Sequence, residues 1–439
     1  MFKYLEYASL AILLALTNSV ALAEFTEEDV KKSFYPYENY TPEFAGYTPG
    51  MIINQANVEQ FKDILDPALY AHVSKGDVEL QTKKTESLEL HPNYIKATLD
   101  AVNNPPSLTG EGQVGNFVAG RAFPQEPDIN DPQAGLKLAW NYQYGYNWGD
   151  NAAIYPFYWK FRNLESGKVE RTIKWNFHFL NWKHRVNQEP VPEIANNPSN
   201  LFRSVYVYAA EPFDIANTQL LIHRYKNDLK RDDAWLYLGF QRRVRRLATG
   251  QTTDSFLGTD LMIEDFEGYN NRVSDYDWKF VGAKNGLLPF HNHNDLNLAT
   301  DMPAETDGYQ FVDFHGKGNC YPKSTWELRK VYELHGTPKD PNHPLSKRVM
   351  FVDAQTFTIP RQSEFDRKGE LWKSFTICQA YPDTHMAKNK GTGVSIDDCF
   401  MMQDLQAGHC TTGQFKGQVD PALNPVNMFT VQNLRKSGR

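Results

Sequence analysis

The sequence predicts an α+β fold that is mainly antiparallel β, with one large curved sheet and a few N-terminal and loop helices. Apolar residues follow helical spacing only between about residues 58 and 102, and alternation with a period of two begins near Arg171. In the run 171–179 the apolar side chains of Ile173, Trp175, Phe177 and Phe179 share one face of a strand. Short turn-forming segments separate the later apolar runs, and strands joined by short turns must be antiparallel.

Three helical segments are expected before the sheet. The first carries Val58, Phe61 and Leu65 on one face. Asp66 followed by Pro67 is a helix start, and Gly76 fits the end of that second helix. A third helix is expected to begin near Pro92. We expect residues 24–110 to form this irregular and helical segment, packed as one unit with a sheet domain over residues 111–439.

Alternation and turn chemistry place the further strands along the rest of the chain. They are predicted at residues 202–209, 218–225, 235–247, 278–281, 325–334, 347–353, 359–364, 371–378, 400–403 and 410–415. Four long connections lie between them, at residues 187–200, 248–276, 290–321 and 381–398. Long loops on a rigid sheet are where functional residues usually lie.

The N-terminus reads as a cleaved secretory signal peptide over residues 1–23. Lys3 precedes a short apolar run at 8–16, and Ala21 and Ala23 supply the small residues of a cleavage site between Ala23 and Glu24. The run is shorter than the roughly 20 residues of a spanning helix, although an uncleaved anchor is the alternative. We therefore expect a soluble periplasmic protein. Its net charge of −7 argues against nucleic acid as a partner.

The apolar face of so large a sheet needs a cover that three short helices do not supply. We therefore expect the sheet to enclose an apolar cavity that binds a lipid or another hydrophobic molecule, each buried CH₂ contributing about 0.8 kcal/mol. Ordinary core packing of the same aromatic residues is the alternative. Alternation selects these candidate lining residues: Trp175, Phe177, Phe179, Trp235, Tyr237, Trp326, Leu328 and Tyr332.

Four cysteines in an exported chain indicate disulfides, and three pairings are open. Cys378 and Cys399 end and begin consecutive antiparallel strands, which favours a Cys378–Cys399 bond. Cys320–Cys410 is then left by elimination. If residues 406–408 form a tight hairpin, Cys410 lies opposite Gln403, about 13 Å along the strand from Cys399.

His291, His293 and Asp295 form the sharpest candidate metal site, since two His at i and i+2 point the same way on a strand. A polar loop rich in turn-forming residues is the alternative. On one continuous strand Arg242 and Arg246 would share a face and could bind an anionic headgroup. An ordinary solvated strand end is the alternative.

Two further patterns bear on chemistry. The acidic run Asp260, Glu264, Asp265 and Glu267 lacks the spacing of a calcium loop. The sequence contains no phosphate loop, nucleophile elbow or HExxH pattern.

Much of the chain resembles the exported family called domain of unknown function 1329. The matching stretches are 49–54 (PGMIIN), 118–124 (VAGRAFP), 131–141 (DPQAGLKLAWN), 235–246 (WLYLGFQRRVRR), 276–279 (YDWK), 329–335 (RKVYELH) and 404–408 (DLQAG). The segment 349–373 is similar to the strand–turn–strand unit of outer-membrane lipoprotein-sorting (LolA/LolB-like) carriers. The four late cysteines and the extended stretch 378–399 depart from the commonest pattern.

This resemblance implies a half-barrel that handles lipids in the periplasm, with a resistance–nodulation–division-type exporter or an outer-membrane protein as partner. It carries over no catalytic residue. We therefore expect a carrier or chaperone without cofactor or catalysis. An exported metal-dependent hydrolase using His291 and His293, and a structural module of an envelope complex without a ligand, are the alternatives.

Overall fold

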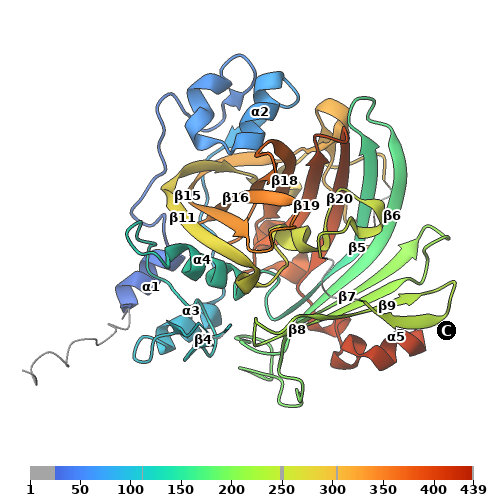
Figure 1. Cartoon of the computed structure of the whole chain (residues 1–439). Helices are drawn as coiled ribbons and strands as arrows, with labels where there is room; N and C mark the ends of the chain where they lie inside the picture. Colours follow the sequence, from blue (N-terminus) through green and yellow to red (C-terminus); the bar gives the residue numbers. More distant parts are fainter. Residues whose placement is uncertain (1–24, 111, 248–251, 303–304, 438–439) are drawn as a thin grey trace, which may run out of the picture.

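A computed structural model describes residues 25–110, 112–247, 252–302 and 305–437. The predicted signal peptide and its Ala23/Glu24 cleavage site lie outside these residues. The described part is built on one 16-stranded sheet in the order β1-β2-β15-β16-β17-β18-β19-β20-β5-β6-β7-β8-β9-β10, with β11 added beside β15 and β12 beside β18 (Figure 1). The sheet is open, because β1 and β10 end the path at opposite edges.

The long strands pair with antiparallel neighbours; β2 with β15 and β12 with β18 are parallel pairs. The strands are β1 Ile52–Ile53, β2 Leu80–Lys83, β5 Asn151–Asn163, β6 Val169–Asn181, β7 Leu201–Glu211, β8 Gln219–Tyr225, β9 Asp233–Leu238, β10 Arg243–Arg246, β11 Tyr276–Leu288, β12 Phe290–His291, β15 Thr325–Pro338, β16 Leu345–Asp353, β17 Arg361–Asp366, β18 Leu371–Ala380, β19 Ile396–Asp404 and β20 His409–Gln418. Two small hairpins pair β3 Ser107–Leu108 with β4 Val114–Gly115 and β13 Phe314–His315 with β14 Tyr321–Pro322. The predicted mainly antiparallel α+β fold is confirmed.

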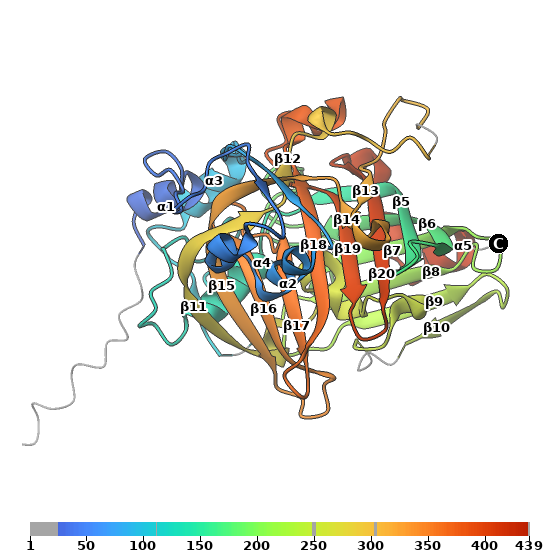
Figure 2. The same cartoon turned by 90° about the horizontal axis from the view of Figure 1, so that it is seen from above.

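Short helices flank the sheet (Figure 2). The α-helices are α1 Glu27–Phe34, α2 Pro67–Lys75, α3 Pro92–Asp100, α4 Ala134–Gln143 and α5 Val431–Ser437. The 3₁₀ helices are η1 Val58–Ile64, η2 Phe256–Gly258, η3 Ile263–Gly268, η4 Val273–Asp275, η5 His293–Asp295, η6 Lys317–Asn319, η7 Pro382–Thr384, η8 Ala387–Asn389, η9 Pro421–Leu423 and η10 Val426–Phe429.

Helix α2 has the ends that the sequence predicts. The Asp66 carboxylate accepts hydrogen bonds from the backbone N–H groups of Ala68 and Leu69, and Gly76 closes the helix in the left-handed conformation. Asp66 is also fully buried against Arg361 of β17, with a distance of 2.7 Å between Nε and Oδ2. The helix cap therefore also ties the N-terminal segment to the sheet.

Two strand predictions need correction. Residues 235–247 form a hairpin of β9 and β10 and not one strand, because the chain turns at Gly239–Arg242, where Arg242 has a φ of 50°. Strand β5 was not predicted, since Pro156 interrupts its pattern and proline cannot donate to a sheet ladder. A bulge between Ile154 and Phe157 accommodates that proline in the centre of the sheet.

One face of the sheet, here called the aromatic face, carries a large apolar cluster. It is formed by β18, β19, β20 and β5 to β8 and includes Phe157, Trp159, Trp175, Phe177, Phe179, Val207, Ile222, Phe375, Phe400 and Phe415. Residues 252–275 are here called the covering segment; η2 and η3 lie on this face, whereas η4 packs with α4. Figure 1 shows the segment in yellow-green across the middle of the sheet. Its Phe256, Leu261 and Phe266 join the cluster.

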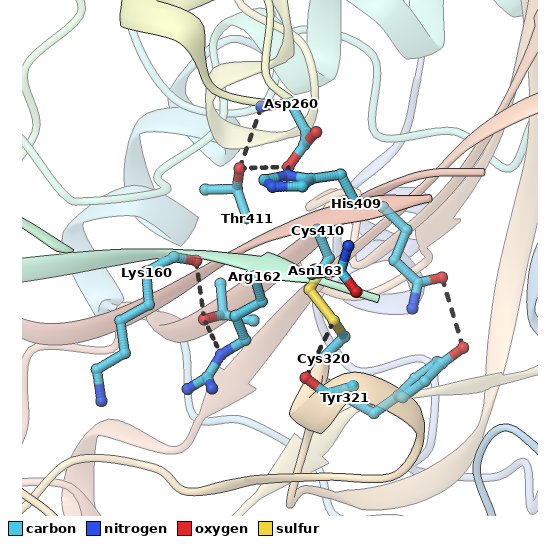
Figure 3. Close-up of a disulfide and its surroundings, with 12 residues drawn as sticks. Lys160, Arg162, Asn163, Asp260, Cys320, Tyr321, His409, Cys410 and Thr411 are labelled. Carbon is cyan, nitrogen blue, oxygen red and sulfur yellow. Dashed lines mark hydrogen bonds and ion pairs between the residues drawn. A yellow bond between two sulfur atoms is a disulfide. The ribbon is translucent and has the colours of Figure 1, made fainter. Parts of the chain in front are cut away.

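A disulfide joins Cys410 of β20 to Cys320 beside β14, with 6.2 Å between the Cα atoms (Figure 3). Cys410 lies opposite Gln403, as expected. Cys378 and Cys399 also lie directly opposite each other, yet both are free, buried thiols, so the favoured Cys378–Cys399 bond is absent. Strand register brought that pair together, whereas Cys320 reaches Cys410 only because residues 305–320 fold back over β20.

Candidate functional site

The aromatic face and the covering segment enclose a small apolar cavity. Its walls come from β5, β6, β7, β18, β19 and β20 on one side and from Leu261 and Phe266 on the other. The space open to the centre of a water molecule is about 40 Å³. That is room for a few waters at most, whereas ligand pockets usually measure about 300–1,000 Å³. The cavity is therefore closed to a hydrocarbon chain in this conformation.

The eight predicted lining residues are divided among several parts of the molecule. Phe177 and Phe179 line the cavity, and Trp175 belongs to the same cluster. Trp235 and Tyr237 lie on the opposite side of β9, where they pack near α5, while Ala234 and Leu236 face the aromatic cluster. Trp326 and Leu328 pack with the N-terminal helices and Tyr332 with α4. Placing those five residues in the cavity was wrong, because α5, the N-terminal helices and α4 each cover a different part of the sheet.

Asp397, Glu267 and Asn270 contribute polar groups to the cavity wall. Burial raises the pKa of Asp397 to about 8, so this carboxyl group is largely neutral at pH 7. The Gln379 amide donates a hydrogen bond to it. Glu267 pairs with Arg203 at 3.3 Å.

Two indole N–H groups on the aromatic face lack a hydrogen-bond partner among the described residues. They belong to Trp159, which lines the cavity, and to Trp175 beside it. A buried polar group without a partner costs about 1–3 kcal/mol. The aromatic face therefore holds unused donors within an otherwise apolar setting.

The acidic run holds the covering segment in place and forms no calcium loop. Arg348 of β16 donates to Glu264, to Asp265 at 2.7 Å and to Glu364 at 2.7 Å, and all four side chains are fully buried. Burial favours the neutral form of Glu264, but Arg348 outweighs it and lowers the pKa to about 2. Burial raises the pKa of Glu364 to about 7.

Asp260, at the other end of the run, accepts a hydrogen bond from the Thr411 hydroxyl at 2.6 Å and contacts His409 at 3.2 Å. Figure 3 shows Thr411 directed to Asp260 and the neighbouring Cys410 directed to Cys320. Strand β20 thus holds the covering segment through Thr411 on one side and Cys320 through Cys410 on the other.

His291 and His293 meet at Asp398 of β19. Nε2 of His291 lies 2.7 Å and Nδ1 of His293 lies 2.6 Å from the same oxygen, Oδ2 of Asp398. Asp295, the third predicted ligand, is exposed at the end of η5, and Asp398 takes its place. His385 and Tyr309 contact the other oxygen, Oδ1, at 3.1 and 2.9 Å. These five residues are here called the His–Asp cluster.

Burial and neighbouring charges act in opposite directions on the pKa values of the cluster residues. Burial lowers the pKa of His291. Burial also disfavours charge on His293, but Asp398 outweighs it and raises the pKa of that ring. Despite its own burial, Asp398 has a pKa well below the usual range because His293 and His385 lie beside it. The sequence contained a partial signal, since all five side chains come from the long connections predicted at 290–321 and 381–398.

The predicted anion site at Arg242 and Arg246 is not formed. Arg242 lies in the β9–β10 turn, whereas Arg246 lies on β10 and pairs with Asp233. The prediction assumed one continuous strand, and the intervening turn separates the two residues. Among the described residues, no helix has the length and apolar composition to cross a membrane.

Comparison with known proteins identifies the family. An uncharacterized protein of Pseudomonas aeruginosa is 24% identical over 357 residues, which cover 79% of this chain and 72% of that protein. A crystal structure from Desulfovibrio piger, of the DUF1329 family, is 18% identical with a TM-score of 0.47, and covers 70% of this chain and 100% of its own. A domain from Vibrio parahaemolyticus, described as of the outer membrane lipoprotein-sorting type, has a TM-score of 0.46 at 18% identity over the same shares.

The family model "Protein of unknown function (DUF1329)" matches residues 52–435. The match confirms the resemblance seen in the sequence and spans the helical segment as well as the sheet. The chain belongs to the DUF1329 family of proteins of unknown function.

Proposed function

We propose that the protein is a periplasmic carrier that holds an apolar molecule against the aromatic face. The observation that supports this most is the nature of the cover. A face built from more than ten buried aromatic and aliphatic side chains is closed by an irregular segment that places Phe256, Leu261 and Phe266 on it. A small cavity remains between the two surfaces.

A ligand must displace part of the covering segment, because about 40 Å³ does not hold an acyl chain. Each ligand CH₂ that replaces a segment side chain on the aromatic face contributes about 0.8 kcal/mol. Opening the segment costs part of that gain. We therefore expect binding to depend on chain length.

The polar groups in the cavity indicate the chemistry of the ligand. A carbonyl or carboxyl oxygen would accept a hydrogen bond from the unpaired indole N–H of Trp159, and the neutral Asp397 could donate another. This pattern favours a fatty acid or an acyl ester over a pure hydrocarbon.

Two neighbouring hairpin ends are suited to exchange of such a ligand with an anionic membrane. Phe213 between β7 and β8 is 98% exposed and Phe240 between β9 and β10 is 74% exposed. Gly239 lies against Ala216 and Asn217, so the two ends are adjacent. Arg242, Arg243 and Arg245 beside them are exposed cations. An exporter or an outer-membrane protein as receiver remains a prediction.

The test is binding of a fluorescent long-chain fatty acid to the wild type and to Phe266→Ala. The variant removes a cover side chain, and room for two further CH₂ groups corresponds to about tenfold tighter binding. Phe280→Ala is the matched control, since Phe280 is equally buried but lies under α4, outside the cavity.

The tight fit of the covering segment favours, as the second candidate, a structural module without a ligand. If neither the wild type nor folded Phe266→Ala binds the probe, and no lipid copurifies with the protein, the carrier is excluded and the structural module is supported. Equal gains in Phe266→Ala and Phe280→Ala would place the binding elsewhere and exclude the aromatic face.

A further inference from the structure

We propose that Nε2 of His291, Nδ1 of His293 and Oδ2 of Asp398 form a binding site for a divalent transition-metal ion, foremost Zn²⁺. The three residues are fully or almost fully buried, and their ligand atoms lie within 4.8 Å of one another. Two imidazoles and one carboxylate are a ligand set that such ions accept. The positions of the protons on the ring nitrogens favour a cation at this place.

The hydrogen bonding of His293 determines its tautomer. Its Nε2 lies 3.0 Å from the backbone carbonyl oxygen of Gln310. A carbonyl can only accept, so Nε2 must carry a proton. In the neutral ring, Nδ1 is then unprotonated, and its lone pair is directed at the Asp398 carboxylate.

His291 repeats this pattern. The Ser324 hydroxyl donates to the carbonyl of Thr325 at 2.9 Å, which leaves its oxygen to accept from Nδ1 of His291 at 2.8 Å. The neutral ring then turns an unprotonated Nε2 toward Oδ2 of Asp398. An imidazole whose second nitrogen donates to a fixed oxygen is the usual support of a metal-binding histidine.

The second carboxylate oxygen of Asp398 is supplied with donors in a different way. Asn389 donates from its amide nitrogen to the carbonyl of Gly417 at 2.8 Å and to Nδ1 of His385 at 2.9 Å. The proton of His385 is therefore on Nε2, which faces Oδ1 of Asp398 at 3.1 Å. Oδ1 thus receives an N–H donor, while Oδ2 faces two lone pairs.

The nitrogen lone pairs of His291 and His293 repel the negatively charged Oδ2 of Asp398. A cation bound between the three atoms removes this repulsion. Without a cation, His293 needs a second proton on Nδ1, which buries an imidazolium group against the carboxylate, and His291 needs either a second proton or a Ser324 hydroxyl turned to donate to its Nδ1. Ligand atoms around an ion at about 2.0–2.1 Å lie roughly 3.3 Å apart, so binding requires the side chains to separate by several tenths of an ångström.

The site joins the connections 290–321 and 381–398 to β19. Because its ligands are buried, a substrate has no direct access, and the ion is assigned a structural role and not that of a hydrolase centre. It follows that binding stabilises the folded protein.

The experiment uses the purified protein after treatment with a chelator, followed by addition of Co²⁺ or Zn²⁺. We expect one ion per chain by elemental analysis, a visible Co²⁺ absorption band and a rise in the thermal midpoint. His293→Gln and Asp398→Asn should lose the ion. Asp295→Ala, which removes an exposed neighbouring carboxylate, should retain it.

Far-ultraviolet circular dichroism checks that each variant is folded, and His385→Gln serves where Asp398→Asn fails to fold, with weaker binding expected. A folded wild type that takes up neither ion and shows no change in thermal midpoint overturns the proposal. So does a loss of the ion in Asp295→Ala equal to that in His293→Gln. Fatty-acid binding is measured separately, so the two proposals can fail independently.

Discussion

Asp397 and Asp398 are neighbours in the chain but lie in opposite environments. A bulge in β19 opposite Cys378 and Gln379 directs Asp397 into the apolar cavity and Asp398 into the His–Asp cluster. Burial raises the pKa of Asp397 to about 8, whereas the histidines hold that of Asp398 far below its usual range. Asp397 has few polar partners in the cavity, whereas Asp398 has many in the His–Asp cluster. The same side chain is therefore neutral in one place and ionised in the other.

The largest expected difference between the two aspartates is in stability. Asp398→Asn removes the buried carboxylate that faces His291, His293 and His385, and we expect a loss of about 3–5 kcal/mol in the free energy of unfolding. Asp397→Asn replaces a neutral carboxyl by a neutral amide and should cause no comparable loss at pH 6, because it also removes the ionised form of Asp397 that favours the unfolded chain. Urea unfolding of both variants measures the contrast. Equal losses would contradict it.

The two cysteine pairs offer a second comparison, between a bonded pair and a pair of free thiols. The Cys320–Cys410 bond spans 90 residues and holds the connection that supplies the His–Asp cluster. Replacing both by Ser should cost about 4.6 kcal/mol in the chain-entropy description. Cys378→Ala with Cys399→Ala removes only buried free thiols and should cost less. Urea unfolding under non-reducing conditions compares them, and the reverse order would indicate that Cys378 and Cys399 are the bonded pair.

The pH dependence of stability tests whether Asp397 is neutral in the folded protein. Between pH 4 and pH 8 the folded protein keeps a proton on Asp397 that the unfolded chain has lost. Asp397 therefore lowers stability as pH rises, by up to about 1.4 kcal/mol per pH unit, and the effect levels off above pH 8. Asp397→Asn should remove this slope. Parallel pH profiles for wild type and variant would show that Asp397 is ionised in the folded state.

The smallest expected effect concerns the exposed hairpin ends. Phe213→Ser with Phe240→Ser should reduce binding to vesicles of anionic phospholipid several-fold, because two inserted rings are lost, and leave fatty-acid binding unchanged. Tyr40→Ser is an exposed aromatic control far along the chain. Co-sedimentation with the vesicles measures both. Unchanged vesicle binding in the double variant would exclude the membrane contact.

Sequence reasoning succeeded where structure is local and failed where it depends on distant segments. Alternation placed Phe177 and Phe179 on the aromatic face, and Asp66 and Gly76 marked the ends of α2. Alternation alone could not tell which face of β9 the covering segment would meet. Asp398 and His385 joined the cluster only through the folding of two long connections and a bulge, which no spacing in the sequence encodes.

Hydrogen exchange of the covering segment tests the carrier most directly. On addition of a long-chain fatty acid, the amides of residues 252–275 should exchange faster, because the ligand displaces Phe256, Leu261 and Phe266 from the aromatic face. The amides around His291 and His293 should be unaffected. Saturating ligand with no change in exchange across residues 252–275 would contradict the account.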